Sequence, residues 1–266
     1  MFIVGSARSG TTLLYHMVIS GGGFALFRAE THAYDVLGPR FAHLRTPAWR
    51  RRLMDEWLRT RHFEMSGLDA AELTRRVVND CRCTGDFLRV FMGMTADAQG
   101  VGRWSDCTPA HVAHLPRIKA EIAEARVIHV IRDGRDVALS AARLGWQRSL
   151  LGVALSAQQM AAVSWQRTVR VGRAAGQKLG ADYLEVRFED LVRQPASVLQ
   201  HVGRFINQPL DYDRIREAGL GSVSQPNTSF AGEGSDRFDP IGRFRTKMTS
   251  DELAPECIRS SFGIRH

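Results

Sequence analysis

The feature that most constrains this chain is its first stretch, FIVGSARSGTTLL at residues 2–14. The apolar, β-branched beginning of this stretch predicts a short buried strand. A loop bounded by Gly5 and Gly10 follows, and Thr11 and Thr12 open an apolar helix. Glycine lets such a loop approach a ligand closely, while backbone N–H groups and the helix N-terminus attract anions. The stretch therefore predicts a phosphate-binding loop.

This loop departs from the loops of nucleotide-hydrolysing enzymes at one position. Gly5, Gly10 and Thr12 fit the pattern G-x-x-x-x-G-K-[ST], but Thr11 stands where the lysine is required. That lysine neutralises the β- and γ-phosphates, so its absence argues against ATP or GTP chemistry. The cation of this loop comes earlier, at Arg8. The alternative for this string alone is an ordinary strand–loop–helix turn.

A second junction between a strand and a helix lies at residues 126–140. RVIHVI predicts a buried strand, and Arg132 stands at its carboxyl end. Ser140 lies eight residues after Arg132, two helical turns along and on the same face as Asp136. A cation and a hydroxyl in these places can bind one phosphate from two directions. The alternative is a surface ion pair of Arg132 with Asp133 or Asp136.

Together the two junctions resemble the sulfotransferases that use 3′-phosphoadenosine 5′-phosphosulfate (PAPS). The string RSGTT at residues 8–12 resembles their 5′-phosphosulfate loop, with arginine first as in the tyrosylprotein and bacterial branches. Arg132 and Ser140 have the spacing of their 3′-phosphate motif. RFEDL at 187–191 and IGRFR at 241–245 resemble two later segments of the family. The resemblance covers residues 2–32, 104–144, 182–195 and 241–253.

The resemblance implies a fold, a reaction and a set of binding residues. The fold is α/β, a single domain over residues 1–266 with a central parallel sheet flanked by helices, as in P-loop nucleotide kinases. The reaction moves a sulfuryl group from PAPS to a hydroxyl acceptor, releases adenosine 3′,5′-bisphosphate and requires no metal. Residues 219–266 would cover the cofactor. The implied cofactor-binding residues are Arg8, Ser9, Gly10, Thr11, Thr12, Arg132, Ser140, Ser229 and Arg243.

The general base is expected near residue 30. Residues 24–27 predict a second strand, which would complete a β–α–β unit with the first. Glu30 follows at the carboxyl end, the edge where α/β sheets bind ligands. Tyrosylprotein sulfotransferases carry their catalytic glutamate at a similar distance after the loop arginine, which implies Glu30, with Arg8 as the catalytic cation. His32 is the alternative base, and a surface carboxylate that caps a helix is the non-catalytic interpretation.

Residues 33–103 match no family segment and predict a helical insertion that shapes the acceptor site. Trp49, Leu53 and Trp57 recur on one helix face, with arginines around them. Such a helix can contact an acidic acceptor or a membrane surface. We favour the alternative, in which the tryptophans are buried and the arginines are solvated.

The turn at residues 104–111 carries a departure from the family. Thr108 suits an N-cap and Pro109 the first helical position. Bacterial sulfotransferases often have a lysine where Cys107 stands. The resemblance therefore implies that Arg8, His111 or another cation takes over that charge. His111 and His114 share a helix face, but without a third ligand they make a weak metal site.

Net charge and cysteine content limit the other classes of function that this chain could have. The net charge of +8 suits an anionic cofactor or acceptor, nucleic acid, or an acidic membrane surface. A P-loop small-molecule kinase stays as an alternative that would need Mg²⁺. A non-enzymatic nucleic-acid binder also stays, although the arginines are scattered rather than clustered with aromatics. Four cysteines without paired spacing predict reduced thiols and a cytoplasmic protein, and neither a leader peptide nor a membrane-spanning run is recognised.

The sequence does not identify the acceptor. A small molecule, glycan, lipid or peptide hydroxyl would each be consistent with it, and the oligomeric state is not indicated.

Overall fold

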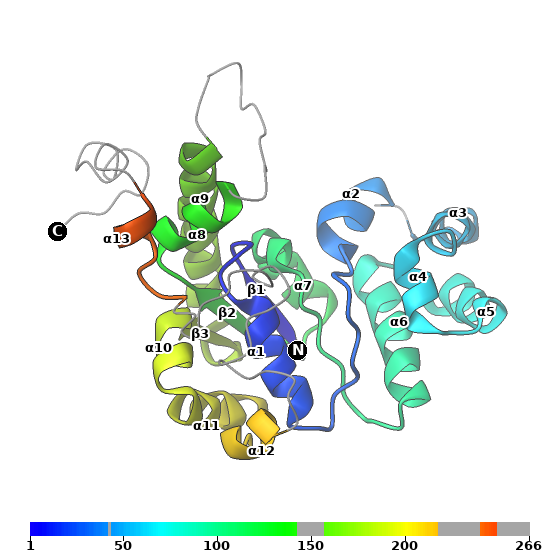
Figure 1. The fold of residues 1–266 in the computed structure, drawn as a ribbon. Coiled ribbons are helices and arrows are strands. Elements are labelled where there is room, and N and C mark those ends of the chain that lie inside the picture. Colours follow the sequence, from blue (N-terminus) through cyan, green and yellow to red (C-terminus); the bar gives the residue numbers. More distant parts are fainter. Residues whose placement is uncertain (42–43, 143–156, 218–239, 249–266) are drawn as a thin grey trace.

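A three-stranded parallel sheet in the order β1-β2-β3 organises the part of the chain that the structure describes. The structure is a computed structural model, which describes residues 1–41, 44–142, 157–217 and 240–248. The strands are β1 (Phe2–Gly5), β2 (Val127–Ile131) and β3 (Tyr183–Arg187). Phe2 pairs with Val127, and Val127 pairs with Tyr183. The first two strands fall where the sequence predicts them, and the α/β class with a parallel sheet flanked by helices is confirmed (Figure 1).

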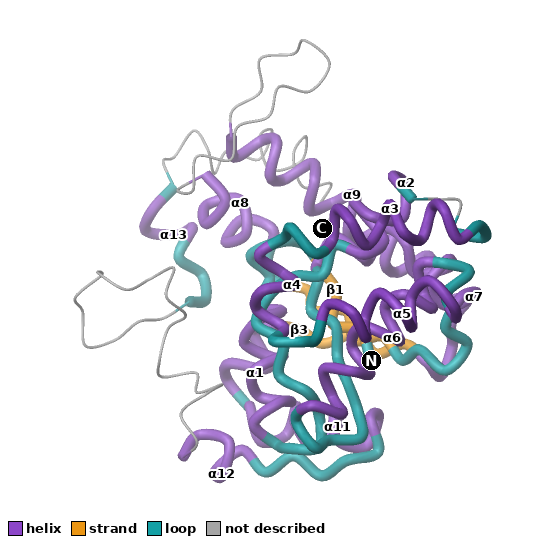
Figure 2. The backbone as a smooth tube through the Cα atoms, turned by 90° about the vertical axis from the view of Figure 1, so that its right-hand side faces the viewer, coloured by secondary structure: helices purple, strands orange, loops and turns teal. Residues whose placement is uncertain are grey.

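Alternating side chains of the strands enter two separate cores, as the twofold period of a strand requires. Phe2 and Val4 pack into one core, beneath α6 (Thr84–Ala98) and α7 (Leu115–Glu121). Ile3 packs into the other, with α1 (Thr11–Ser20) and α11 (Pro195–Ile206). The sheet thus lies between two layers of helices, which surround the strands in Figure 2.

Two extended segments continue the sheet beyond β1. The amide of Ile3 donates to the carbonyl of Asp106 at 2.9 Å, and the amide of Ala25 donates to that of Arg103 at 2.8 Å. Residues 103–106 therefore lie between β1 and residues 24–27. The predicted second strand is wrong, because it forms only one isolated bridge. Beyond that bridge, the side-chain amide of Gln99 replaces a strand partner by bonding both the N–H and the C=O of Leu26.

The described part of residues 33–103 is largely helical, as predicted, and Leu53 and Trp57 of α3 (Pro47–Trp57) are buried. Arg50 is buried too, and its guanidinium donates to the carbonyl of Cys81 at 2.7 Å. The expectation that α3 solvates its arginines is therefore wrong at Arg50, which satisfies the orphan carbonyl at the end of α5. The helices of this insertion are α2 (Gly38–Arg40), α3 (Pro47–Trp57), α4 (Arg61–Ser66), α5 (Ala70–Asp80) and α6.

The remaining helices lie at the carboxyl edge and along the sheet. They are α8 (Gly134–Ala142), α9 (Ala157–Leu179), α10 (Phe188–Arg193), α12 (Tyr212–Glu217) and α13 (Phe244–Lys247), with a π-helical turn at Ala33–Leu37 and 3₁₀ turns at Pro109–His114 and Gly180–Asp182. Within the described residues, no helix is both long and apolar enough to cross a bilayer.

Candidate active site

The predicted phosphate loop connects β1 directly to α1. Gly10 is the N-cap of α1 with φ of 91°, and a Cβ there would lie 2.2 Å from the ring of Phe188. A Cβ on Gly5 would lie 2.5 Å from the carbonyl oxygen of Val130. Both positions therefore require glycine. No side chain of the described residues caps α1, so its first N–H groups can receive an anion.

Arg8 occupies the middle of the loop in a left-handed conformation with φ of 71°. Its Nε donates to the hydroxyl of Ser140 on α8 at 3.0 Å. Its carbonyl accepts from the guanidinium of Arg132, which follows β2, at 3.1 Å. Three residues that the sequence proposes for the cofactor are thus in direct contact, although they lie up to 132 positions apart.

Arg132 is a buried cation. Its guanidinium lies 4.6 Å from the centre of the Phe188 ring and donates to the carbonyl of Pro240 at 2.5 Å. Its Nε is buried without a hydrogen-bond partner in the described structure. Burial lowers the pKa of Arg132. An unsatisfied N–H on a buried guanidinium is costly, and an anion would satisfy it.

The surface ion pair that the sequence left open for Arg132 is not formed. Asp133 pairs instead with Arg135 at 2.7 Å. Asp136 accepts the backbone amides of Gly242 at 2.7 Å and Phe244 at 3.1 Å. Both carboxylates therefore bind groups other than Arg132. The hydrogen bonds of the Arg132 guanidinium go instead to the phosphate loop and to the C-terminal segment.

The C-terminal segment lies on α8 beside Arg132, and α13 is adjacent to α8 in Figure 1. Its anchors are Asp136 and the guanidinium of Arg135, which lies 3.8 Å from the centre of the Phe244 ring. Arg243, half-buried, is close enough for its charge to lower the pKa of Arg132. Ser229 lies outside the described residues, as do most of residues 219–266.

On the other side of the loop, residues 106–108 lead from the sheet toward Glu30. The side chain of Cys107 forms a hydrogen bond with that of Thr11, and the charge of Glu30 acts on the same thiol. Burial raises the pKa of the Cys107 thiol. Cys107 is therefore neutral and supplies no replacement for the family lysine.

Thr108 is the N-cap residue of the following 3₁₀ turn and Pro109 opens that turn, as predicted, but the hydroxyl of Thr108 makes no capping hydrogen bond. The hydroxyl accepts instead from the amide of Thr31 at 2.9 Å and lies 3.3 Å from Asp106. These bonds tie residue 31 to the segment beside β1. They hold Glu30 and His32, its neighbours on either side, at the carboxyl edge of the sheet.

Glu30 and His32 lie next to each other in this edge. Oε2 of Glu30 is 3.4 Å from Nε2 of His32, and Nδ1 of His32 is 2.8 Å from Oδ2 of Asp35. Burial raises the pKa of Glu30, partly offset by the charge of His32. The hydrogen bond to Asp35 raises the pKa of His32. The raised pKa of each group makes it a stronger base than the free side chain.

Backbone strain marks two of the proposed catalytic residues. Arg8 and His32, with φ of 71° and 49°, are two of three non-glycine residues with positive φ in the described chain. The third, Asn207, ends α11 in an ordinary C-cap. His32 is the N-cap of the π-helical turn Ala33–Leu37, whereas Arg8 caps no helix, and a strained residue without such a role is characteristic of a functional site.

Comparison with protein families identifies the family of this chain. The model described as "Sulfotransferase family" matches residues 1–212, most of the chain. The chain belongs to the sulfotransferase family. Its members are transferases that use PAPS as the sulfuryl donor. No match is found among curated proteins.

Solved structures show the same fold at low sequence identity. The sulfotransferase domain of the Synechococcus PCC 7002 olefin synthase is 19% identical, with a TM-score of 0.64 over 100% of this chain and 94% of that one. The sulfotransferase domain from the curacin biosynthetic pathway is also 19% identical, with a TM-score of 0.66 over 99% and 97%. Sulfotransferase STF9 from Mycobacterium avium is 17% identical, with a TM-score of 0.53 over 99% and 74%.

In this sulfotransferase, the sequence did not single out Asp35 as a site residue. Asp35 lies in the helical turn Ala33–Leu37 and contacts both His32 and His111. A lone aspartate at the start of a helical turn normally indicates a cap, so its spacing gave no signal. Asp106 and His111 both belong to the turn at residues 104–111 that the sequence indicated. In the structure, Oδ1 of Asp106 lies 2.9 Å from Nδ1 of His111. Among the described residues there is no cluster of three or more side chains that could hold a metal.

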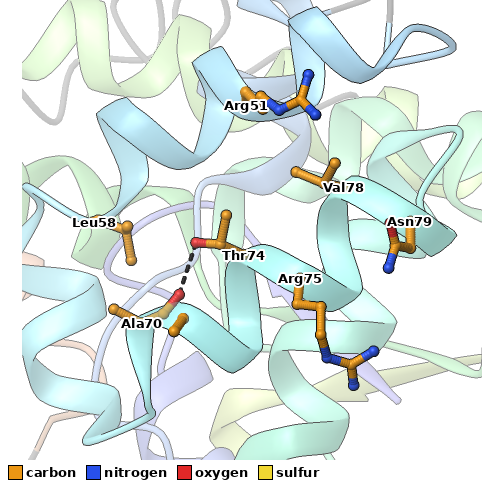
Figure 3. A pocket seen from close by; sticks show the side chains of 8 residues that line it. Arg51, Leu58, Ala70, Thr74, Arg75, Val78 and Asn79 are labelled. Atoms are coloured by element: carbon orange, nitrogen blue, oxygen red, sulfur yellow. Dashed lines mark hydrogen bonds between the residues drawn. The ribbon is translucent and has the colours of Figure 1, made fainter.

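The helical insertion also carries a shallow hollow of about 520 Å³ between α3 and α5 (Figure 3). It contains none of the residues that the sequence proposes for the active site. Its lining residues are Arg51, Leu58, Ala70, Ala71, Thr74, Arg75, Val78 and Asn79.

Proposed function

We propose that this sulfotransferase moves a sulfuryl group from PAPS to a hydroxyl acceptor at the Glu30–His32 edge and releases adenosine 3′,5′-bisphosphate. The observation that carries the proposal is the contact among Arg8, Arg132 and Ser140 beside the uncapped N-terminus of α1. Two cationic sites lie at one sheet edge, Arg8 with the start of α1 and Arg132 with Ser140. Such a pair suits a nucleotide that carries phosphates at two ends.

The two groups divide the nucleotide between them. Arg8 and the amides of residues 9–12 would hold the 5′-phosphosulfate, because the helix N-terminus and the loop cation converge there. Arg132 and Ser140 would hold the 3′-phosphate, and the orphan Nε of Arg132 fits an anion. Arg243 would cover the nucleotide from the C-terminal segment, with Ser229. PAPS supplies the sulfuryl group, and the protein supplies fixed positive charge near the departing 5′-phosphate.

Glu30 is the proposed proton acceptor, with His32 as its immediate partner. Cys107 contacts Thr11 at the start of α1, and the charge of Glu30 acts on the same thiol, which supports a position of this carboxylate near the loop. A hydroxyl bound there would have Glu30 on one side and the sulfuryl donor on the other. General-base catalysis of this kind contributes roughly 10²–10⁴-fold to the rate.

The insertion at residues 33–103 is proposed to shape the acceptor site. The ring of His62, on α4, lies 6.2 Å from the ring of His32 and stacks on Trp57 at 5.8 Å. The α4 helix thus borders the proposed base from the insertion. A glycan, lipid, peptide or small-molecule hydroxyl is compatible with this edge. The unpaired thiols of Cys81, Cys83 and Cys107 favour a reducing, cytoplasmic compartment.

Adenosine 3′,5′-bisphosphate is expected to stabilise the protein against heat, whereas ATP with Mg²⁺ leaves the melting temperature almost unchanged. A ligand at 100 times its Kd adds about 2.7 kcal/mol to the free energy of unfolding. Differential scanning fluorimetry across both nucleotides measures this. The opposite order would replace the sulfotransferase proposal with the P-loop kinase.

Arg132→Ala is expected to weaken bisphosphate binding by about 10- to 150-fold, because a charge-assisted phosphate contact contributes roughly 1.5–3 kcal/mol. Adenosine 5′-monophosphate, which lacks the 3′-phosphate, should bind wild type and variant alike. Titration calorimetry with both nucleotides checks this, with Arg173→Ala, an exposed arginine paired with Glu185, as the control. A variant that still prefers the bisphosphate as strongly as wild type would remove Arg132 from the 3′-phosphate.

A further inference from the structure

Five acidic and imidazole side chains alternate in one chain that runs from the surface to the core. The separations between successive groups are 3.4 Å from Glu30 to His32, 2.8 Å from His32 to Asp35, 3.4 Å from Asp35 to His111 and 2.9 Å from His111 to Asp106. Side-chain exposure falls along it, from 47% at Glu30 through 37% and 20% to zero at His111 and Asp106.

Asp35 is the member that joins the exposed pair to the buried pair. Its Oδ2 faces Nδ1 of His32, and its Oδ1 lies 3.4 Å from Nε2 of His111, a nitrogen that also accepts the amide of Tyr34 at 3.1 Å. The π-helical turn fixes this arrangement, because the amides of Val36 and Leu37 both donate to the carbonyl of His32 at 3.1 Å. The left-handed backbone of His32 is thus held from the same turn that presents Asp35.

The contact with Asp35 determines the proton positions on His32. A carboxylate only accepts hydrogen bonds, so Nδ1 of His32 must carry the proton that faces Asp35. In the neutral ring, Nε2 then keeps its lone pair. That lone pair lies on the side of the ring that faces Glu30.

We propose that Asp35 is a positioning residue that makes His32 the acceptor of the proton that Glu30 removes from the acceptor hydroxyl. The inference rests on the proposed function. As the acceptor oxygen bonds to sulfur, the bond between sulfur and the 5′-phosphate oxygen of PAPS breaks, and its electron pair leaves with adenosine 3′,5′-bisphosphate. In the same step the acceptor O–H bond breaks and a Glu30 O–H bond forms. That bond then breaks as Nε2 of His32 gains the proton. The imidazolium charge is balanced by Asp35, and Glu30 is again a carboxylate.

The electrostatics of the edge agree with this transfer. The titratable groups that face His32 within the described structure are Glu30, Asp35, His111 and His62 of α4. The hydrogen bond to Asp35 raises the pKa of His32, and burial lowers it. Burial lowers the pKa of His111 as well, but the carboxylates of Asp106 and Asp35 raise it to about 9. The two carboxylates of His32 therefore outweigh burial and the neighbouring imidazoles, so His32 holds a received proton more strongly than a free imidazole does, and the transfer requires a pH above this raised pKa.

Histidine NMR tests the positioning role without any acceptor. In ¹⁵N-histidine-labelled wild type, neutral His32, assigned by its loss in His32→Asn, is expected as the Nδ1–H tautomer. In Asp35→Asn this preference and the elevated pKa should be lost. Asp86→Asn is the control, since Asp86 is a part-buried carboxylate that accepts the amides of Arg82 and Cys83. An Nε2–H tautomer in wild type overturns the proposal even if Asp35→Asn fails to fold.

Turnover provides the second readout, once a sulfated product is found with labelled PAPS. Asp35→Asn should lower turnover by about 10²-fold, the lower end of general-base catalysis, with bisphosphate affinity unchanged and Asp35→Glu partly restoring the rate. Unchanged turnover and tautomer in Asp35→Asn would overturn the inference alone. A wild type that bisphosphate does not stabilise would overturn the proposed function instead, whatever His32 does.

Discussion

Replacement of Arg8 by alanine is expected to lower turnover by about 10²–10³-fold and also to weaken the binding of adenosine 3′,5′-bisphosphate. Arg8 is the loop cation, and it touches both Ser140 and, through its carbonyl, Arg132. Negative charge grows on the 5′-phosphate as the sulfuryl group departs, and removal of one preorganised donor to such a charge typically costs this much. Radiolabelled transfer and titration calorimetry measure the two effects.

The conformation of Arg8 provides an internal control. With φ of 71°, any side chain at this position is strained by about 1–2 kcal/mol, which glycine relieves. Arg8→Gly should therefore unfold no more easily than wild type while it loses turnover as Arg8→Ala does. Arg8→Lys keeps the charge but loses the planar guanidinium and should recover part of the rate. If Arg8→Gly retained wild-type turnover, the strain at Arg8 would have no catalytic purpose.

The parts of the fold that the sequence predicts are those with strong local signals. The run Phe2–Gly5 and the glycines around the loop suffice to predict β1 and the start of α1 at Thr11. The β-branched run before Arg132 suffices for β2. For both strands, the apolar residues that predict burial and the residues that suit the following turn indicate the same structure. No contact with a distant segment is therefore needed to predict them.

The parts that the sequence misses depend on contacts between distant segments. Residues 24–27 are apolar enough for a strand, yet the side chain of Gln99 and the intervening residues 103–106 decide their pairing. Thr108 occupies the predicted N-cap position, but its hydroxyl accepts a hydrogen bond from the amide of Thr31, 77 positions away, instead of capping the turn. Asp35 acquires its role only because residues 30–35 pack against His111. No local pattern carries such information.

The substitution Glu30→Gln tests the proposed general base. Its turnover is expected to fall by roughly 10²–10⁴-fold, the usual contribution of a general base, with bisphosphate affinity nearly unchanged. The reason is that Glu30 acts on the acceptor hydroxyl and only in the transition state, whereas Arg8 also holds the ground-state nucleotide. Glu64→Gln, an exposed glutamate on the neighbouring α4, is the control.

The pH dependence of turnover separates Glu30 from His32. Burial raises the pKa of Glu30 above that of a free glutamate, so the ionised base is lost as pH falls through this raised value, and turnover falls with it. Glu30→Gln should abolish this acid limb. The raised pKa of His32 adds a second loss at low pH, because only neutral His32 can take the proton from Glu30. His32→Asn should remove this second loss but keep the acid limb of Glu30, with a smaller fall in rate, because the proton has left the acceptor before His32 receives it. A collapse in His32→Asn beside near-normal Glu30→Gln would make His32 the direct base, with its lone pair held toward the acceptor by Asp35.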